Sequence, residues 1–299
     1  MSLSRGVGEM ADAWGRWQRL PSSSPYYLSP GQDGGCSATT NIVRLYTATV
    51  TVNSEIRAGV HLLEMHLPAL AQAVQPGQYC MVRCCHPFAY DPLLRRPFFV
   101  HSVQRAQGLC TLLVHAHGRG TTWLVQQQAG ATLDVLGPIG HGWEVRSTVR
   151  NLLLLSEGPL INGVALLAQI ASAQEVVVTL VGQFANAKEV YPPALLPPEV
   201  EYHIVTTDGS VGQKGDLQSV LATYLSWADA ACCSVSRETS MHLYSHFERL
   251  RTKYFAQGIL LHPIVCANGA CLACTVQTHS GSSLVCRDGP VFDLREVAR

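Results

Sequence analysis

Short runs of alternating apolar and polar residues, separated by Gly and Pro, dominate the chain between residues 41 and 145. Residues 47–52 are rich in Thr and Val, and residues 60–67 alternate in the manner of a half-buried strand. Few runs in this part of the chain have helical spacing. The pattern therefore predicts a small antiparallel β-barrel. The expected strands are 47–52, 60–67, 79–83, 97–103 and 110–115.

Strands and helices alternate between residues 146 and 257. Residues 152–155 form a short apolar run, and residues 163–173 have the length and composition of a helix. Strands joined by helices of this length predict right-handed crossovers and a doubly wound parallel sheet of the nucleotide-binding type. The further expected elements are strands 175–181, 201–206 and 230–234 and helices 216–226 and 238–253.

The two ends of the chain differ from these parts. Residues 1–40 are rich in Ser, Gly and Pro without a sustained period, which predicts a poorly ordered extension. Residues 258–299 are rich in cysteine and are expected to form a third, small unit. The expected fold class is therefore α+β and multidomain, with a β-barrel (41–145), an α/β domain (146–257) and a small C-terminal domain.

Charge and hydropathy narrow the possible function classes. The 21 Lys and Arg residues balance 21 Asp and Glu residues, so no basic excess marks a nucleic-acid-binding face. With 47% hydrophobic and 14% charged residues, the bulk of the chain is expected to be ordered, with part of its surface buried against a partner. No run reaches the ~20 apolar residues of a membrane span, and the N-terminus lacks the apolar core of a secretory signal. A soluble, cytoplasmic protein is expected.

Four of the eleven cysteines lie close together near the C-terminus, at Cys266, Cys271, Cys274 and Cys286. The first part of their spacing, C-x4-C-x2-C-x11-C, matches the arrangement that holds plant-type two-iron clusters. Small residues between them allow backbone N–H groups to turn toward the sulfurs and stabilise the cluster's negative charge. The sequence predicts a [2Fe–2S] cluster on these four thiolates. A structural zinc site, which usually pairs two short knuckles, and four unrelated thiols are the alternatives.

A second motif, LRRPFF at residues 94–99, places arginine beside a rigid proline. An arginine next to such a turn can present its guanidinium fork to a pyrophosphate. Taken alone, the motif is also typical of an exposed basic turn. It lies upstream of a glycine-containing stretch, GRGTTWL at residues 118–124.

The cysteine-rich sequence CANGACLACTVQT, together with DGPVF at residues 288–292, closely resembles the electron-transfer subunits of type B dihydroorotate dehydrogenases. That family belongs to the ferredoxin-NADP reductase superfamily. The resemblance covers about residues 42–299 and leaves the N-terminal extension aside. It implies an FAD-binding β-barrel, an NAD-type α/β domain and a [2Fe–2S] tail.

The resemblance assigns three segments to FAD, because residues 96–99 and 118–124 are similar to the family's R-P-x-S and G-x-G-T-x-x-L motifs. Gly120 and Thr121 would approach the pyrophosphate through backbone N–H groups. Two residues depart from the family, since Phe stands where Ser is usual in the first segment and His where Arg is usual in the second. The linker LGPIGHGW matches the family well. The FAD residues implied are Arg96, Pro97, Phe98, Phe99, Leu113, Val114, His115, Gly120 and Thr121.

The nicotinamide site departs most from the family. The family's first α/β strand is followed by G-G-x-G-x-x-P-L, whereas this chain reads SEGPLINGVAL at residues 156–166. Glu157 adds negative charge beside the expected phosphates, and Pro159 removes a backbone donor. The family's Cys-Gly-Pro segment is disrupted around residues 232–236, whereas residues 206–215 fit its T-D-D-G-S-x-G-x-x-G. Either NADH is used despite this turn, or the domain takes another ligand or none.

The resemblance implies an electron-transfer subunit that passes electrons between a pyridine nucleotide and the FMN of a dihydroorotate dehydrogenase catalytic subunit. The route would lead through FAD and the [2Fe–2S] cluster, in pyrimidine biosynthesis, within a heterotetramer of two copies of each chain. No residue here is expected to act on dihydroorotate, so no catalytic residue is assigned. The alternative is an NAD-independent electron-transfer or assembly subunit of another redox complex. A zinc-tailed binding module is a third interpretation.

Overall fold

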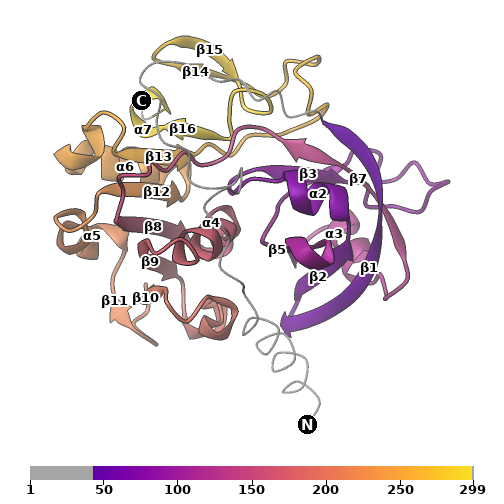
Figure 1. Cartoon of the computed structure of the whole chain (residues 1–299), viewed down its shortest axis with the longest axis horizontal. Helices are drawn as coiled ribbons and strands as arrows, with labels where there is room; N and C mark the ends of the chain where they lie inside the picture. Colours follow the sequence, from indigo (N-terminus) through magenta and orange to yellow (C-terminus); the bar gives the residue numbers. More distant parts are fainter. Residues whose placement is uncertain (1–42, 298–299) are drawn as a thin grey trace.

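The computed structural model describes residues 43–297, so the extension predicted for residues 1–40 lies outside the described residues. Within the described part, the strands form two seven-stranded sheets and one two-stranded ribbon. Figure 1 shows the first sheet curled beside the second, with the ribbon near the C-terminus above the second sheet. None of the helices between residues 43 and 297 is long and apolar enough to cross a bilayer.

The first sheet is antiparallel throughout, with the strand order β4-β3-β7-β1-β2-β6-β5. Its end strands β4 and β5 are separated by only residues 100 and 101 in the chain, so the sheet must curl until its edges approach each other. This confirms the predicted antiparallel barrel architecture. The strands are β1 (Arg44–Arg57), β2 (Val60–His66), β3 (Tyr79–Val82), β4 (Arg96–Phe99), β5 (Ser102–Gln104), β6 (Leu109–His115) and β7 (Thr132–Ile139), and the helices against them are α2 (Pro68–Ala73) and α3 (Arg119–Val125).

The single strand predicted at 97–103 is two strands in the structure. Up to Phe99 the chain pairs with β3, and from Ser102 it pairs with β6. The change of partner takes place at His101, whose backbone N–H donates to Thr111 O (2.9 Å). Phe98, Val100 and Val103, on both sides of this corner, pack in the same barrel core. No Gly or Asn marks the corner in the sequence, so the sequence predicts the segment as one strand.

The second sheet has the order β11-β10-β9-β8-β12-β13-β16 and is parallel except for its edge strand β16. The predicted doubly wound parallel sheet is thereby confirmed. Its strands are β8 (Asn151–Glu157), β9 (Val177–Phe184), β10 (Glu201–Thr206), β11 (Gln213–Lys214), β12 (Ala230–Ser234), β13 (Ala256–Ile259) and β16 (Val291–Asp293). Its helices are α4 (Asn162–Ser172), α5 (Leu217–Leu225) and α6 (Arg237–His246).

The apolar run 152–155 is the centre of this sheet and is buried on both faces. Leu152 and Leu154 pack in one core with residues of α4, whereas Leu153 and Leu155 pack in a second core with residues of α5 and α6. A parallel strand covered by helices on both sides has no solvent-facing positions, which explains the continuous run of leucines.

The cysteine-rich tail is joined to the second sheet. Strands β14 (Thr275–Thr278) and β15 (Gly281–Leu284) pair as a hairpin, β16 pairs with β13, and the short helix α7 (Leu294–Val297) follows. Buried side chains of the tail belong to the core under α5 and α6. The sheet therefore holds the tail in a fixed position.

The linker after β7 is also bound to the tail through the backbone. The backbone N–H of His141 donates to Gly289 O (2.6 Å), and a Cβ on Gly140 would lie 2.4 Å from the same oxygen. Gly140 also has a left-handed backbone (φ +81°). Only glycine permits this approach of two backbones, which accounts for the glycine in the family-like linker.

A buried hydrogen bond joins the barrel to the α/β domain. Nε2 of His101, just after β4, lies 2.7 Å from the hydroxyl of Tyr191, and the two rings pack with centroids 5.8 Å apart. Both side chains are buried, and burial lowers the pKa of His101 from 6.5 to about 4. The imidazole is therefore neutral in the folded protein over the physiological pH range.

We expect the free energy of unfolding to fall as the pH falls from 6.5 toward 4, because the unfolded chain protonates His101 while the folded chain does not. The contribution of this group is about 3 kcal/mol at most. The measurement is urea unfolding of wild type and of His101→Gln between pH 4 and 7.5. The variant should show a smaller loss of stability over this range, and equal pH profiles would contradict the assignment.

Candidate functional site

The loop from Cys266 to Cys274 is shaped by its backbone. Ala267, Gly269 and Leu272 all have left-handed φ angles (+60°, +83° and +57°), which turns successive N–H groups in the direction of Cys266. The backbone N–H of Cys271 donates to the Sγ of Cys266 (3.4 Å). Hydrogen bonds from these backbone N–H groups, most of all from that of Asn268, lower the pKa of Cys266 to about 6. The loop therefore stabilises a thiolate, the form that binds iron.

The other half of the cysteine set lies deeper. Cys274 and Cys286 are buried, and the backbone N–H of Cys286 donates to Cys274 Sγ (3.4 Å), whereas Cys271 is exposed. Burial, with Cys274 as a neighbour, raises the pKa of Cys286 to about 12. Among residues 43–297, no three His, Cys, Asp or Glu side chains gather closely enough to hold a single metal ion. The assignment of the four thiolates to a two-iron cluster stays a prediction.

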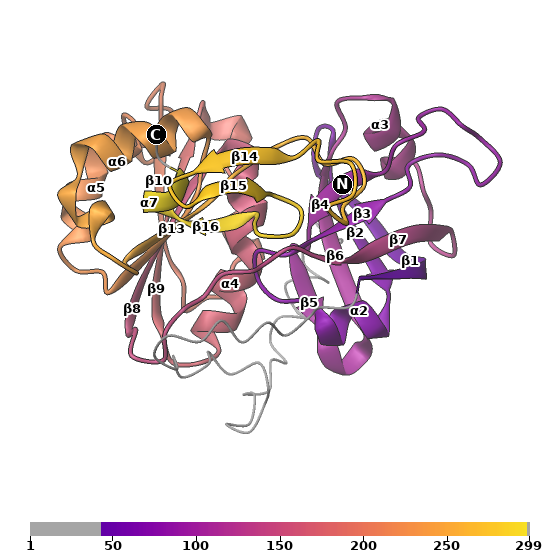
Figure 2. The ribbon, with the colours of Figure 1, turned by 90° about the horizontal axis from the view of Figure 1, so that it is seen from above.

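The cysteine loop packs directly on the barrel. Ala267 shares a small buried cluster with Tyr79, Met81 and Ile139, and Phe99 packs against the same cluster. Figure 2 shows the yellow loop lying over β3 and β4. The predicted cluster residues are thus brought next to β4, the strand that carries the first predicted FAD segment.

Tyr79 is the residue between the two predicted cofactor sites. It pairs with Phe99 across β3 and β4, and the two rings meet edge to face with centroids 6.3 Å apart. Its hydroxyl is buried without a hydrogen-bond partner among the described residues. Burial, and then the nearby thiols of Cys286 and Cys274, raises the pKa of this tyrosine.

Arg96 and Gly120, which belong to different predicted FAD segments, lie side by side. A Cβ on Gly120 would lie 3.6 Å from Arg96 Nε and 3.1 Å from Cys84 Cβ. The hydroxyl of Thr121 accepts from the backbone N–H groups of His117 and Gly118 (both 3.1 Å), which shapes the turn into α3. The close approach gives a backbone cradle next to a guanidinium, a combination that suits a pyrophosphate.

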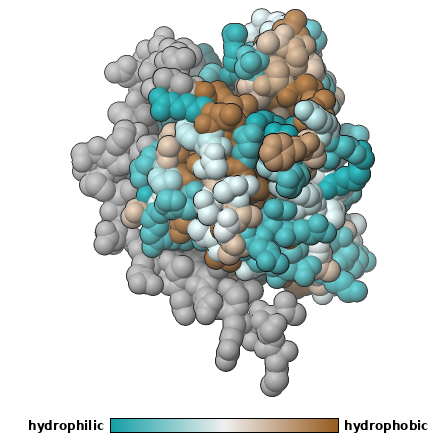
Figure 3. All heavy atoms as spheres, turned by 90° about the vertical axis from the view of Figure 1, so that its right-hand side faces the viewer, coloured by the Kyte–Doolittle hydropathy of each residue, from teal (hydrophilic) through white to brown (hydrophobic). Residues whose placement is uncertain are grey.

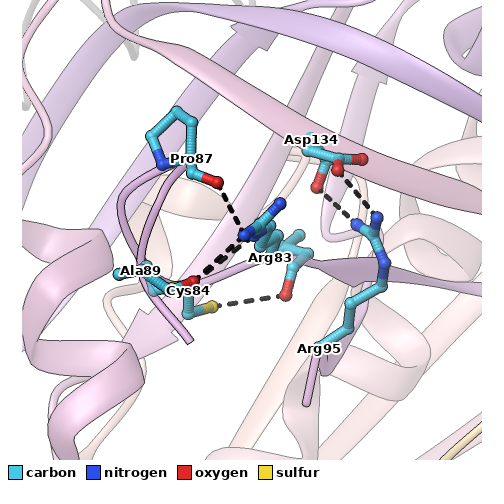
Figure 4. Close-up of polar contacts among 8 residues, drawn as sticks. Arg83, Cys84, Pro87, Ala89, Arg95 and Asp134 are labelled. Atoms are coloured by element: carbon cyan, nitrogen blue, oxygen red, sulfur yellow. Dashed lines mark hydrogen bonds and ion pairs between the residues drawn. The ribbon is translucent and has the colours of Figure 1, made fainter. Parts of the chain in front are cut away.

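The neighbouring arginine points elsewhere and has a structural role. Arg95 donates to Asp134 through two bonds, Nη1 to the backbone oxygen (3.0 Å) and Nη2 to Oδ2 (2.7 Å), as Figure 4 shows. Arg83, in the same view, donates to the carbonyls of Pro87 and Ala89 and so folds the loop before β4. Of the two arginines in the motif, Arg96 is the one beside the glycine turn.

The second predicted FAD segment forms the C-terminal end of β6, at the junction of the two domains. Leu113 and Val114 are buried, and His115 is half-buried with its Nε2 unpartnered among the described residues. Burial, and then the charge of Arg57, lowers the pKa of His115. From α4, Asn162 Nδ2 donates to Leu113 O (3.3 Å), while its buried Oδ1 also has no partner in the described part. Unpaired buried groups are costly, so their presence fits a polar ligand at this junction.

Sequence reasoning did not identify Tyr79 or Asn162. Tyr79 lies in no recognisable motif, and each residue gains its position from a partner far away in the chain: Tyr79 from β4, and Asn162 from β6. The signals in the sequence are that Tyr79 begins a predicted strand and that Asn162 lies in the turn at residues 156–166.

Comparison with solved structures identifies the fold of the chain. The chain is similar to one from work on flavin-based electron bifurcation by the NADH-dependent reduced ferredoxin-NADP oxidoreductase, with a TM-score of 0.71 and 23% identity over 84% of this chain and 89% of that chain. Residues 263–298 match the family described as the iron-sulfur cluster binding domain of dihydroorotate dehydrogenase B. The chain is therefore a protein with a ferredoxin-reductase-like fold and a C-terminal segment that matches an iron–sulfur cluster binding domain.

Two relatives then identify the family. The chain is 31% identical over 255 residues to the dihydroorotate dehydrogenase B (NAD(+)) electron transfer subunit of Geobacillus thermodenitrificans, covering 83% of this chain and 96% of the relative. It is 28% identical over 262 residues to the subunit of the same name from Desulforamulus reducens, covering 85% and 98%. The chain belongs to the family of dihydroorotate dehydrogenase B electron transfer subunits.

Proposed function

We propose that this chain is the electron-transfer subunit of a dihydroorotate dehydrogenase and carries electrons between FAD in its barrel and a [2Fe–2S] cluster in its tail. The observation that carries the proposal is the packing of the cysteine loop on β3 and β4, beside the predicted FAD segment. When bound, FAD supplies electrons in pairs or singly, and the cluster supplies them one at a time. The domain bounds 41–145, 146–257 and 258–299 are part of this proposal.

The chain's own residues would hold each group. Cys266, Cys271, Cys274 and Cys286 would ligate the irons, and backbone N–H groups of the loop would stabilise the sulfurs. Arg96 and the Gly120 turn would hold the FAD pyrophosphate, with the remaining predicted FAD residues along β4 and β6. Ala267 packs in a buried cluster with Tyr79 and Ile139, and this packing would keep water out of the space between the two sites.

The outer side of the cysteine loop supports a protein partner. Leu272 (62% exposed) lies next to Cys271, which is exposed as well. On the barrel, Phe88 (87% exposed) and Tyr90 are also presented to solvent, and Figure 3 shows hydrophobic side chains exposed among hydrophilic ones on that side of the molecule. Exposed apolar groups of this kind are typical of interaction surfaces. The partner in this proposal is the FMN-containing catalytic subunit, in a heterotetramer that works in pyrimidine biosynthesis.

We expect dihydroorotate to reduce the cluster of this chain only when the catalytic subunit is present. The experiment mixes the two purified subunits anaerobically, adds dihydroorotate and follows flavin bleaching and the EPR signal of the reduced cluster. This chain alone is the control, because none of its residues is assigned to dihydroorotate. If dithionite reduces the cluster but dihydroorotate with the catalytic subunit does not, the proposal is wrong. A different stable co-purifying subunit would then favour another redox complex.

A further inference from the structure

A carboxylate of the chain itself stands at the sheet edge where doubly wound folds bind dinucleotides. In such folds, ligands bind beyond the carboxyl ends of the strands, where the strand order reverses. Here the chain runs outward from β8 through β9 and β10 and then returns to β12 on the other side of β8. The reversal therefore lies between β8 and β12. Glu157 is the last residue of β8, and Ser234 is the last residue of β12.

The Glu157 carboxylate spans this reversal point. Its Oε2 accepts hydrogen bonds from the backbone N–H of Ser236 (2.9 Å) and from the hydroxyl of Thr239 (3.0 Å). Ser236 caps α6 and also accepts from the backbone N–H of Thr239 (3.1 Å). Backbone donors at a helix start attract anionic ligand groups. Here the donors of Ser236 and Thr239 are paired with groups of the chain, one of them already an anion.

The turn between β8 and α4 offers little to a phosphate. Residues Gly158–Ile161 form a 3-10 helix, η2, whose first turn contains Pro159 and so lacks an N–H group. The Ser234 hydroxyl donates to Leu160 O (2.6 Å), which fixes this turn against β12. A Cβ on Gly163 would lie 2.3 Å from Ser234 Oγ, so the start of α4 is packed tightly against the same strand.

The half-buried charge at this edge has the wrong sign for a pyrophosphate. Glu157 is half-buried, whereas the first turn of α6 carries the exposed pair Arg237 and Glu238, whose charges balance each other. A carboxylate beside an incoming phosphate repels it, and the repulsion is strongest where water is partly excluded. The residues of this edge therefore do not fit a pyridine dinucleotide.

We propose that the Glu157 side chain occupies the sheet edge where a dinucleotide would bind, and so prevents this chain from using NADH or NADPH. The carboxylate takes the place of an anionic ligand group at α6 and holds the ends of β8 and β12 together. Electrons then reach and leave this chain through its protein partners. The inference rests on the proposed function. It concerns the choice that the sequence left open, namely whether this subunit exchanges electrons with a pyridine nucleotide or only with protein partners.

Direct binding to the full-length protein with FAD and cluster tests the proposal. Wild type is expected to bind NADH and NADPH with a Kd above about 1 mM in calorimetric titration. The double variant Glu157→Gly, Pro159→Ala removes the carboxylate and restores a backbone donor, so it should bind NADH at least about tenfold more tightly. Glu157→Ala alone should give part of this gain. Glu199→Ala, at an exposed carboxylate of the same domain, is the matched control and should change nothing.

Two results would overturn the proposal: micromolar NADH binding by wild type, or unchanged affinity in both Glu157 variants. If Glu157 only stabilises the start of α6, the variants lose thermal stability without a gain in NADH affinity. That result counts against the proposal. Circular dichroism shows whether each variant is folded, and Glu157→Ala remains informative if the double variant is not. Dihydroorotate-driven cluster reduction needs no pyridine nucleotide, so failure of the proposed function and failure of this inference give different results.

Discussion

Replacing Cys274 with Ser is expected to remove the iron–sulfur cluster from the purified protein. Cys274 Sγ is buried and accepts a hydrogen bond from the backbone N–H of Cys286, so no solvent ligand can easily take its place. Serine oxygen is a poor replacement for a thiolate on iron. Iron and acid-labile sulfide per chain should fall by about tenfold or more, and the EPR signal of the dithionite-reduced protein should disappear.

The matched control for this substitution is Cys85→Ser. Cys85 is also buried, and its sulfur donates to Ala89 O and accepts from Arg83 Nε, two contacts that a serine hydroxyl can retain. Its iron and sulfide content should equal that of wild type. Retention of the full cluster by Cys274→Ser would contradict the ligand assignment. Zinc without sulfide in the wild-type protein would instead support the zinc-tailed binding module.

Arg96→Leu should weaken FAD binding by about 100-fold. Charge-assisted hydrogen bonds contribute about 1.5–3 kcal/mol each, so a guanidinium that makes even one or two of them to a pyrophosphate accounts for this loss. Arg96 lies beside the Gly120 turn, where such a group would be held. The measurement is titration of the flavin-free protein with FAD, followed by the quenching of flavin fluorescence.

Arg95→Leu is the control, because it changes the adjacent arginine of the same motif. Its bonds to Asp134 tie β4 to β7, so the variant should unfold at a lower urea concentration. Its FAD affinity should stay within about fivefold of wild type. If Arg95→Leu loses FAD and Arg96→Leu keeps it, the two arginines have the opposite roles to those assigned.

Local patterns in the sequence determined the classes of structure. Alternation in the first half and the apolar run 152–155 correctly predicted an antiparallel barrel and a parallel sheet, because each period reflects which faces of a strand are covered. Cysteine spacing predicted the cluster loop, and residues 263–298 match a family of cluster-binding domains. These signals are readable because they lie within a few residues of one another.

Element ends were less well determined. The helix predicted at 238–253 ends at His246, and Phe247 is extended before the 3-10 helix η5 (Glu248–Arg251). Phe247 packs against the core shared by α6 and the tail, and Leu250 is fully buried in it. Tertiary packing of these two side chains outweighs the helical preference of the segment.

Only the tertiary structure decided how distant segments meet. Tyr79 stands between the cysteine loop and β4, and Glu157 reaches Ser236, 79 positions further along the chain. Sequence alone showed that Glu157 was an unexpected charge in a glycine turn, but not that the charge has partners on α6. The physical reason is that a hydrogen bond between strand ends depends on which strands are neighbours, and strand order arises from the packing of the whole sheet rather than from local spacing.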